Sequence, residues 1–315
     1  MEKFVISSSP HFKSGNRTAG IMLAVIGALL PSAIAGCIYF GLPAVGVIVV
    51  GIASAVIAEA VTQKLMRQPV TVSDFSAVLT GLLLALNLPS TTPLWIVALG
   101  RVLSIVVAKQ MFGGLGCNFV NPALLGRIVV TLCFTEATSR FLEPFAPVDA
   151  VSGATLLNSI QSGGKLPGLW QVFIGNHAGC IGETCSAALI LGGIVLIALR
   201  IISPIIPISY IATTYAMTAL FGHSPLYSVL SGGLLIGAVF MATDYVTSPL
   251  TARGKLIFGI GCGLITAVIR IWGSNAEGVS YAIVFMNVLT PLIDRATMRR
   301  SPFASSKKKR EVQGA

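Results

Sequence analysis

IMLAVIGALLPSAIAGCIYFG (21–41) runs directly into LPAVGVIVVGIASAVIAEAV (42–61), and these two apolar stretches decide the fold class of the chain. Their only charged residue is Glu59, near the end of the second stretch. A helix that crosses a membrane needs about 20 mostly apolar residues, because its backbone polar groups must be hydrogen-bonded within the segment. The sequence therefore predicts two spanning helices here, and the first is too long to be a cleaved signal peptide.

The whole chain has the same character. Its 315 residues are 54% hydrophobic and 10% charged, with a mean hydropathy of +0.86. A soluble domain carries about 25% charged residues, so this composition excludes a soluble enzyme, a disordered protein and a nucleic-acid-binding domain. The net charge of +10 does not indicate nucleic acid, because the basic residues gather at the ends of apolar segments. The chain is predicted to be an integral membrane protein.

The hydropathy pattern predicts an all-α membrane protein with about ten spanning helices. We divide it into a first five-helix half (1–135), a loop (136–184), a second five-helix half (185–300) and a basic tail (301–315) with the run KKKR. The loop is rich in Gly, Pro and Ser, and loops of this length are usually functional or disordered. The expected spans are 19–41, 43–62, 74–90, 93–111, 119–135, 185–201, 204–221, 227–244, 255–272 and 278–295.

Lysine and arginine in short loops predict the orientation, because they accumulate on the cytoplasmic side. With ten spans, the loops on one side hold only Arg140 and Lys165. Both termini are therefore expected in the cytoplasm, with the 136–184 loop on the outer side of the cytoplasmic (inner) cell membrane. Sixteen basic residues fall on the cytoplasmic side: Lys3, Lys13, Arg17, Lys64, Arg67, Lys109, Arg200, Arg253, Lys255, Arg295, Arg299, Arg300, Lys307, Lys308, Lys309 and Arg310.

Two segments indicate an internal repeat. SAVLTGLLLA (76–85) is similar to SVLSGGLLIG (228–237), and a polar segment ending in proline follows each. Asn121 and Asn287 occupy similar positions later in the two halves. The matching segments lie five helices apart, so the halves would have opposite orientations in the membrane, as in inverted repeats that form a site at their interface. The alternative is that Leu- and Gly-rich spans resemble one another without being related.

The loop contains the motif that carries chemistry, DAVSGAT (149–155). The pattern D-x-x-[ST]-G-A-[ST] is one in which a flavin transferase attaches FMN to a Thr or Ser hydroxyl through a phosphoester. Thr155 is the expected acceptor, with Asp149, Ser152, Gly153 and Ala154 as the surrounding motif. The alternative is that Ser152 or Thr155 caps a short helix through LLNS. Capping and flavin attachment do not exclude each other.

With these motifs the chain resembles the D subunit of the Rnf complex and its relative, the B subunit of the sodium-pumping NADH:quinone oxidoreductase. The lack of a long N-terminal extension and the form ATDYVTSP favour the Rnf member. The resemblance rests on GLLLALNLP (81–89), GGLGCNFVNPALLGR (113–127), DAVSGATLLNS (149–159), GNHAGCIGETC (175–185) and MATDYVTSPLTARGK (241–255).

The resemblance implies a membrane electron carrier in a redox-driven Na⁺ or H⁺ pump that passes electrons between ferredoxin and NAD. As one subunit of this translocase, the chain would complete no reaction alone. It would be a flavoprotein with covalent FMN on the outer side and a second, non-covalent riboflavin or FMN. Its partners would be membrane and peripheral subunits carrying flavins and iron–sulfur clusters, and a flavin transferase. The sequence has no nucleotide-binding G-x-G-x-x-G and no cluster-like cysteine spacing.

A second flavin is expected near the GGLGCNFVNPA stretch (113–123), whose glycines let backbone N–H groups approach a ligand. Helix packing is the alternative explanation of these glycines. Charged residues within spans are candidate functional residues because they are costly in a membrane. Glu59 and Asp294 are explained as well by snorkelling or capping at the cytoplasmic ends. The expected residues of this site are Gly114, Gly116, Asn118 and Asn121, with Arg101 or Asp244 nearby.

The sequence leaves several alternatives open. Ten spans with an inverted repeat also suit a solute transporter or channel, and a structural anchor for other subunits is a weaker alternative. A flavin-acceptor threonine discriminates against a plain transporter. Cys180 and Cys185 could form a disulfide on the outer side, although packed thiols are favoured. The histidines are far apart, and we expect no metal site.

Overall fold

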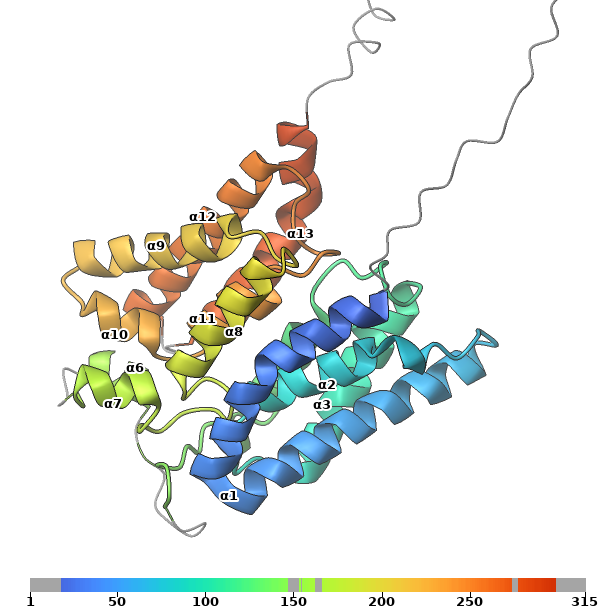
Figure 1. Ribbon diagram of the computed structural model, residues 1–315, viewed down its shortest axis with the longest axis horizontal. Coiled ribbons are helices and arrows are strands. Elements are labelled where there is room, and N and C mark those ends of the chain that lie inside the picture. Colours follow the sequence, from blue (N-terminus) through green and yellow to red (C-terminus); the bar gives the residue numbers. More distant parts are fainter. Residues whose placement is uncertain (1–17, 147–152, 154, 162–165, 274–276, 299–315) are drawn as a thin grey trace, which may run out of the picture.

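The computed structural model describes residues 18–146, 153, 155–161, 166–273 and 277–298, which form α-helices joined by loops and turns. No β-strand forms among them, and one isolated bridge joins Phe141 to Gly153. Figure 1 shows one group of helices from the N-terminal part, blue to green, and another from the C-terminal part, yellow to red. The prediction of an all-α chain is confirmed for the described residues.

Several helices are apolar along most of their length. Four are long enough to cross a membrane: α1 (Thr18–Leu65), α3 with its extensions (Leu94–Phe112), α12 (Ala252–Trp272) and α13 (Val279–Thr297). Four shorter apolar helices accompany them: α2 (Ser76–Leu86), α4 (Pro122–Cys133), α8 (Ser186–Ala198) and α9 (Ile205–Leu220). The length and composition of these helices therefore define the fold as that of an α-helical membrane protein.

Helix α1 changes direction at Gly41, which has φ 65° and ψ −150°. This backbone conformation favours glycine because it has no Cβ atom, and Pro43 just after it lacks a backbone donor. In Figure 1 the two halves of α1 run in opposite directions. The break lies where the sequence predicts the boundary between the spans 19–41 and 43–62.

The expected continuous span 227–244 is wrong, because the chain is broken there. Helix α10 (Pro225–Leu230) is followed by α11 (Leu234–Ile236) and the π-helical turn η4 (Gly237–Met241). Gly232 between α10 and α11 has φ 64°, which interrupts the helix. The buried Arg270 guanidinium of α12 donates to the carbonyls of Ser228 and, at 3.3 Å, Ser231. It therefore satisfies carbonyls that the broken helix cannot.

The predicted loop 136–184 begins within α5 (Thr135–Thr138) and contains α6 (Leu156–Gln161) and α7 (Leu169–Ile174). Its last part, 177–184, is buried rather than exposed. The backbone N–H of Gly182 donates to Leu86 O at 2.8 Å, and the Ser32 hydroxyl donates to Gly182 O at 2.7 Å. A Cβ atom on Gly182 would lie 2.4 Å from Leu86 Cβ, so glycine is required for this close approach.

Where the N-terminal and C-terminal groups of helices meet, α1 packs against α8 and α4 packs against α13. Near the second contact Asn121 and Asn287 lie side by side. In the amide orientation that satisfies both of its polar atoms, Asn287 accepts the Asn121 backbone N–H at 3.2 Å. Two residues 166 positions apart in the chain therefore meet inside the bundle.

Candidate functional site

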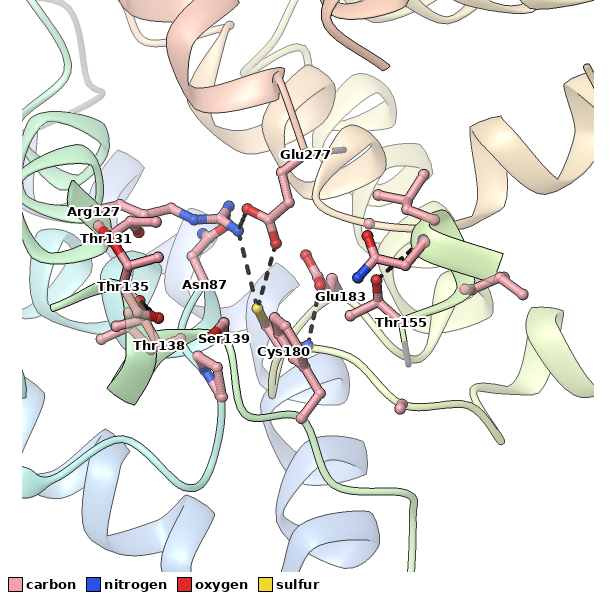
Figure 2. A pocket seen from close by; sticks show the side chains of 18 of the residues that line it. Asn87, Arg127, Thr131, Thr135, Thr138, Ser139, Thr155, Cys180, Glu183 and Glu277 are labelled. Carbon is pink, nitrogen blue, oxygen red and sulfur yellow. Dashed lines mark hydrogen bonds and ion pairs between the residues drawn. The ribbon is translucent and has the colours of Figure 1, made fainter. Parts of the chain in front are cut away.

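Thr155 lies at a cavity of about 170 Å³ between the two groups of helices, which we call the Thr155 cavity (Figure 2). Thr155 itself is half-buried. The cavity combines hydroxyl, amide and charged side chains, and polar groups in a concave site are typical of ligand binding. Its polar lining residues include Asn87, Arg127, Thr131, Thr135, Thr138, Ser139, Asn158, His177, Cys180, Glu183 and Glu277.

The backbone around Thr155 places its hydroxyl at the start of α6. Thr155 Oγ1 accepts the backbone N–H of Asn158 at 3.3 Å, which is the capping arrangement considered as an alternative. Two residues earlier, the Gly153 N–H donates to Phe141 O at 2.9 Å. The cap uses one lone pair of the hydroxyl, so the oxygen remains available to the cavity. Asp149, Ser152 and Ala154 of the motif lie outside the described residues.

An arginine-centred cluster lies at the cavity wall. The Arg127 side chain is largely buried; its guanidinium donates to Asn87 Oδ1 at 2.6 Å and forms an ion pair with Glu277. It also lies 3.9 Å from Cys180 Sγ. In the sequence Arg127 is only the last residue of the motif GGLGCNFVNPALLGR (113–127), and nothing singles out Glu277. The fold alone brings these side chains together, from α4, the residues before α13 and the loop before α8.

Glu183 is the second carboxylate of this cluster, and it is 3% exposed. Its Oε1 accepts the Cys180 backbone N–H at 3.0 Å, whereas Oε2 has no hydrogen-bond partner in the described part of the chain. Burial raises the pKa of the Glu183 carboxyl, and the nearby charge of Glu277 adds to the rise. Burial also raises the pKa of the Cys180 thiol and lowers the pKa of His177 to about 4.

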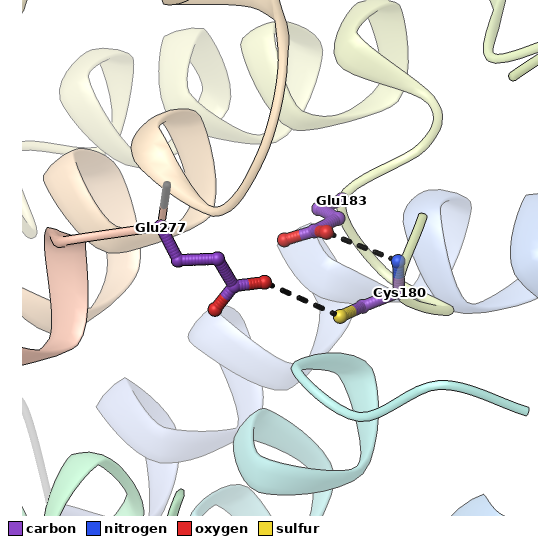
Figure 3. Close-up of side chains that lie close together, drawn as sticks. All are labelled: Cys180, Glu183 and Glu277. Carbon is purple, nitrogen blue, oxygen red and sulfur yellow. Dashed lines mark hydrogen bonds between the residues drawn. The ribbon is translucent and has the colours of Figure 1, made fainter. Parts of the chain in front are cut away.

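The ligand atoms of Cys180, Glu183 and Glu277 lie within 4.8 Å of one another. Figure 3 shows the three side chains close together. Such a group could in principle hold a metal ion. Here the Arg127 guanidinium binds Glu277 directly and supplies a positive charge at the cluster. The arrangement is therefore that of a guanidinium–carboxylate cluster in which Glu277 is partly exposed. All six cysteines are free thiols, so Cys180 and Cys185 are not bonded.

A second cavity, of about 210 Å³, lies beside Asn121, and we call it the Asn121 cavity. Asn121 caps α4 by accepting the Ala123 N–H at 3.0 Å and donates to Met241 O at 3.3 Å. The cavity combines polar groups with apolar walls, and the predicted residues Asn118, Asn121 and Asp244 all line it. Its other lining residues include Ser76, Leu79, Thr80, Leu83, Lys109, Leu115, Val239, Phe240, Thr243 and Tyr245.

Lys109 and Glu59 form a buried ion pair at the wall of this cavity, with 2% and 1% of their side chains exposed. Lys109 Nζ lies 2.7 Å from Glu59 Oε1 and 2.6 Å from Ser76 Oγ. This burial excludes snorkelling for Glu59, one of the explanations that the sequence leaves open for it. The sequence places Lys109 at the cytoplasmic end of its span, and the structure shows its side chain buried at the end of the π-helical turn η2 (Ser104–Lys109).

Three other predicted residues are placed elsewhere. Arg101 is fully buried, donates to Thr80 O at 2.8 Å and is not among the lining residues of either cavity. Its Nε and Nη2 atoms have no partner among the described residues. Gly114 and Gly116 have φ of 91° and 92°, and they form the turn that precedes the cavity residues Asn118 and Asn121. The turn requires their conformational freedom.

Long apolar helices around two cavities with polar lining residues define the protein as a helical membrane protein with internal cavities. The chain belongs to the NQR2, RnfD, RnfE family, which residues 5–302 match. It is 47% identical over 301 residues to the D subunit of the Na⁺-translocating ferredoxin:NAD⁺ oxidoreductase complex of Acetobacterium woodii, covering 94% of each chain.

Other relatives agree with this assignment. The chain is 40% identical to the D subunit of the proton-translocating ferredoxin:NAD⁺ oxidoreductase complex of Clostridium ljungdahlii, with 93% of this chain and 94% of the relative covered. It is 39% identical to the D subunit of the ion-translocating oxidoreductase complex of Stutzerimonas stutzeri, with 89% and 91% covered. The resemblance inferred from the sequence motifs is confirmed.

Proposed function

We propose that this chain is the D subunit of an Rnf-type ferredoxin:NAD⁺ oxidoreductase that moves Na⁺ or H⁺, and that it carries electrons through FMN attached to Thr155. The observation that carries the proposal is the position of Thr155, a half-buried hydroxyl at a polar cavity within an intact flavin-acceptor motif. Relatives that are D subunits and match nearly the whole chain support the complex to which it belongs. The bound flavin would supply the redox chemistry, and the protein its position and electrostatics.

The residues around Thr155 fit a covalent flavin. The hydroxyl lies at the cavity, so the attached group can enter it, while the Thr131, Thr135 and Ser139 hydroxyls offer hydrogen-bond partners. Arg127 lies at the cavity wall, where its ion pair with Glu277 holds the guanidinium in place.

The test is the mass and fluorescence of the chain purified with its complex. The intact mass should exceed the sequence mass by one FMN minus one water, and the chain should fluoresce in a denaturing gel. Thr155→Ala should remove both, and Thr155→Ser should keep part of them because the bond needs only a hydroxyl. Ser139→Ala, at the same cavity, is the control and should keep both. Fluorescence that survives Thr155→Ala would refute the attachment site.

A second, non-covalent flavin is proposed for the Asn121 cavity. Asn118, Asn121 and Asp244 present amide and carboxylate groups to a ring edge, and apolar side chains line the walls. Lys109 is neutralised by Glu59, so its ammonium is not a free cation for a phosphate. This favours riboflavin over FMN. An electron that crosses the membrane needs an intermediate carrier such as this flavin, because the hydrocarbon layer is about 30 Å thick.

We further propose two inverted five-helix halves with both termini in the cytoplasm and Thr155 outside. Support comes from the packing of α1 against α8 and of α4 against α13, since these helices would be the first and the last of each half. The contact between Asn121 and Asn287 supports the same pseudo-twofold relation. A reporter fused after Ala315 should locate to the cytoplasm and one inserted near Gly163 to the outside; a C-terminal reporter outside would contradict the arrangement.

The two alternative functions make different predictions. A B-subunit role in a Na⁺-translocating NADH:quinone oxidoreductase would require quinone-dependent activity in the purified complex. A solute transporter would function without a covalent flavin, so uptake that is unaffected by Thr155→Ala would favour it. The relatives are named as D subunits of ion-translocating oxidoreductase complexes, two of them ferredoxin:NAD⁺ oxidoreductases, and these names favour the leading proposal.

A further inference from the structure

Glu183 is a buried carboxylate at the Thr155 cavity for which the attachment of a flavin gives no role. It is 3% exposed, and its Oε2 atom has no hydrogen-bond partner in the described part of the chain. Gly233 packs closely against this carboxylate, because a Cβ atom there would lie 3.3 Å from Oε2 and 3.1 Å from Arg127 Nη1. An ionised carboxylate in such a place is costly unless a charge or a proton compensates it.

The surrounding charged groups are already engaged. Arg127 pairs with Glu277, and Arg270 donates to the carbonyls of the broken helix. No ion pair of Glu183 forms among the described residues, so its charge is the one left without a direct partner. The titratable groups facing it are Arg127 of α4, Arg270 of α12, Glu277 and Tyr281 at the start of α13, and Cys180 and His177 of its own loop.

Protonation of Glu183 is therefore sensitive to any further charge in the cavity. Glu277 disfavours the charged form and Arg127 favours it, so the two neighbours oppose each other. A negative charge that arrives in the same cavity adds to the effect of Glu277 and favours the protonated form. Thr155 and Glu183 line one cavity, and Figure 2 shows both beside the Arg127–Glu277 pair.

We propose that Glu183 is a redox-linked proton site: it binds a proton when the group on Thr155 gains an electron and releases it when the electron leaves. This inference rests on the proposed flavin at Thr155. In the forward step one electron, supplied by the oxidoreductase complex, reduces the flavin to its one-electron state. One proton from the aqueous phase forms an O–H bond with the Glu183 carboxylate, so one negative and one positive charge enter together.

The cavity that Glu183 lines also has hydroxyl side chains in its wall. The Thr131, Thr135 and Ser139 hydroxyls line the same cavity, and Thr135 and Ser139 are exposed. Hydroxyl groups both donate and accept hydrogen bonds, so this lining is suited to passing a proton. The proton therefore reaches Glu183 from the side of the protein on which Thr155 lies.

The test is a potentiometric titration of the covalent flavin in the purified complex at a series of pH values. If one proton binds per electron, the one-electron midpoint potential changes by about 59 mV per pH unit. We expect such a slope in the wild type and less than half of it in Glu183→Gln. Glu143→Gln is the matched control, because Glu143 is an exposed carboxylate near Gly153, and it should keep the wild-type slope.

A wild type without a slope, or a Glu183→Gln variant that keeps more than half of it, would overturn the proposal. A second measurement needs no variant: the infrared difference spectrum between reduced and oxidised wild type should gain a carboxylic C=O band that shifts on ¹³C-glutamate labelling. Absence of that band would also refute a proton on Glu183. If the intact mass shows no flavin on Thr155, the proposed function fails before the titration begins, and this inference falls with it.

Discussion

The buried ion pair between Lys109 and Glu59 allows a quantitative prediction. The ammonium of Lys109 lies 2.7 and 2.8 Å from the two oxygens of Glu59 and 2.6 Å from Ser76 Oγ. Lys109→Met keeps most of the side-chain volume and removes the charge. Glu59 then keeps only the amide donors of Gln110 at 3.1 Å and Gln63 at 3.3 Å.

A carboxylate left in that environment has no cation to compensate it. Removing one partner of a buried ion pair costs about 3–5 kcal/mol, because the remaining charge stays buried. We expect a loss in this range for Lys109→Met and a similar loss for Glu59→Gln, which leaves the ammonium unpaired. The double variant contains neither charge, so its loss should fall short of the summed single losses by about 3 kcal/mol.

The measurement is urea unfolding in lipid–detergent micelles, followed by tryptophan fluorescence. The control is the ion pair between Arg140 and Glu136, whose side chains are 62% and 87% exposed. Arg140 Nη2 lies 2.6 Å from Glu136 Oε1. Neutralising either member should change the free energy of unfolding by less than about 1 kcal/mol. If the losses of the two buried variants add in the double variant within about 0.5 kcal/mol, the residues do not compensate each other and the reasoning is refuted.

Three further predictions concern the two cavities and the buried loop. Acid extraction of the Thr155→Ala protein should still release a flavin, and Asn121→Ala should lower the amount of flavin released. If the Thr155→Ala protein releases no flavin, the inner flavin belongs to another subunit. Because burial lowers the pKa of His177 from 6.5 to about 4, its neutral form stabilises the fold above pH 6.5. As the pH falls from 6.5 towards 4, the free energy of unfolding should decrease by about 3 kcal/mol, at about 1.36 kcal/mol per pKa unit. The free energy of unfolding of His177→Gln should depend less on pH. Gly182→Ala should destabilise the protein by about 1–3 kcal/mol through overpacking. Gly168→Ala, with no neighbour within 4 Å, should have little effect, and equal losses would contradict the packing argument.

The class of protein and its family follow from the amino-acid sequence without any structure. Apolar segments about 20 residues long predict membrane helices because lipid offers no hydrogen bonds to the backbone, and this physical constraint needs no tertiary information. The break at Gly41 and the start of α4 at Asn121 and Pro122 also follow local rules. Glycine allows a backbone conformation that interrupts a helix, and proline favours the first position of one. The motif around Thr155 is identifiable because its residues are consecutive in the chain.

The surroundings of Thr155 and the set of buried charges depend instead on tertiary contacts. Arg127, Glu183 and Glu277 are separated by 56 and 94 positions along the chain, and no periodicity links them. A lysine at the end of a span usually extends into water, yet Lys109 is buried with Glu59 of α1. The break at Gly232 could not be predicted from the local sequence. The carbonyls that it frees, those of Ser228 and Ser231, accept hydrogen bonds from Arg270, which is distant in sequence. Long-range side-chain partners compensate buried charge and broken backbone, and the sequence does not contain their positions.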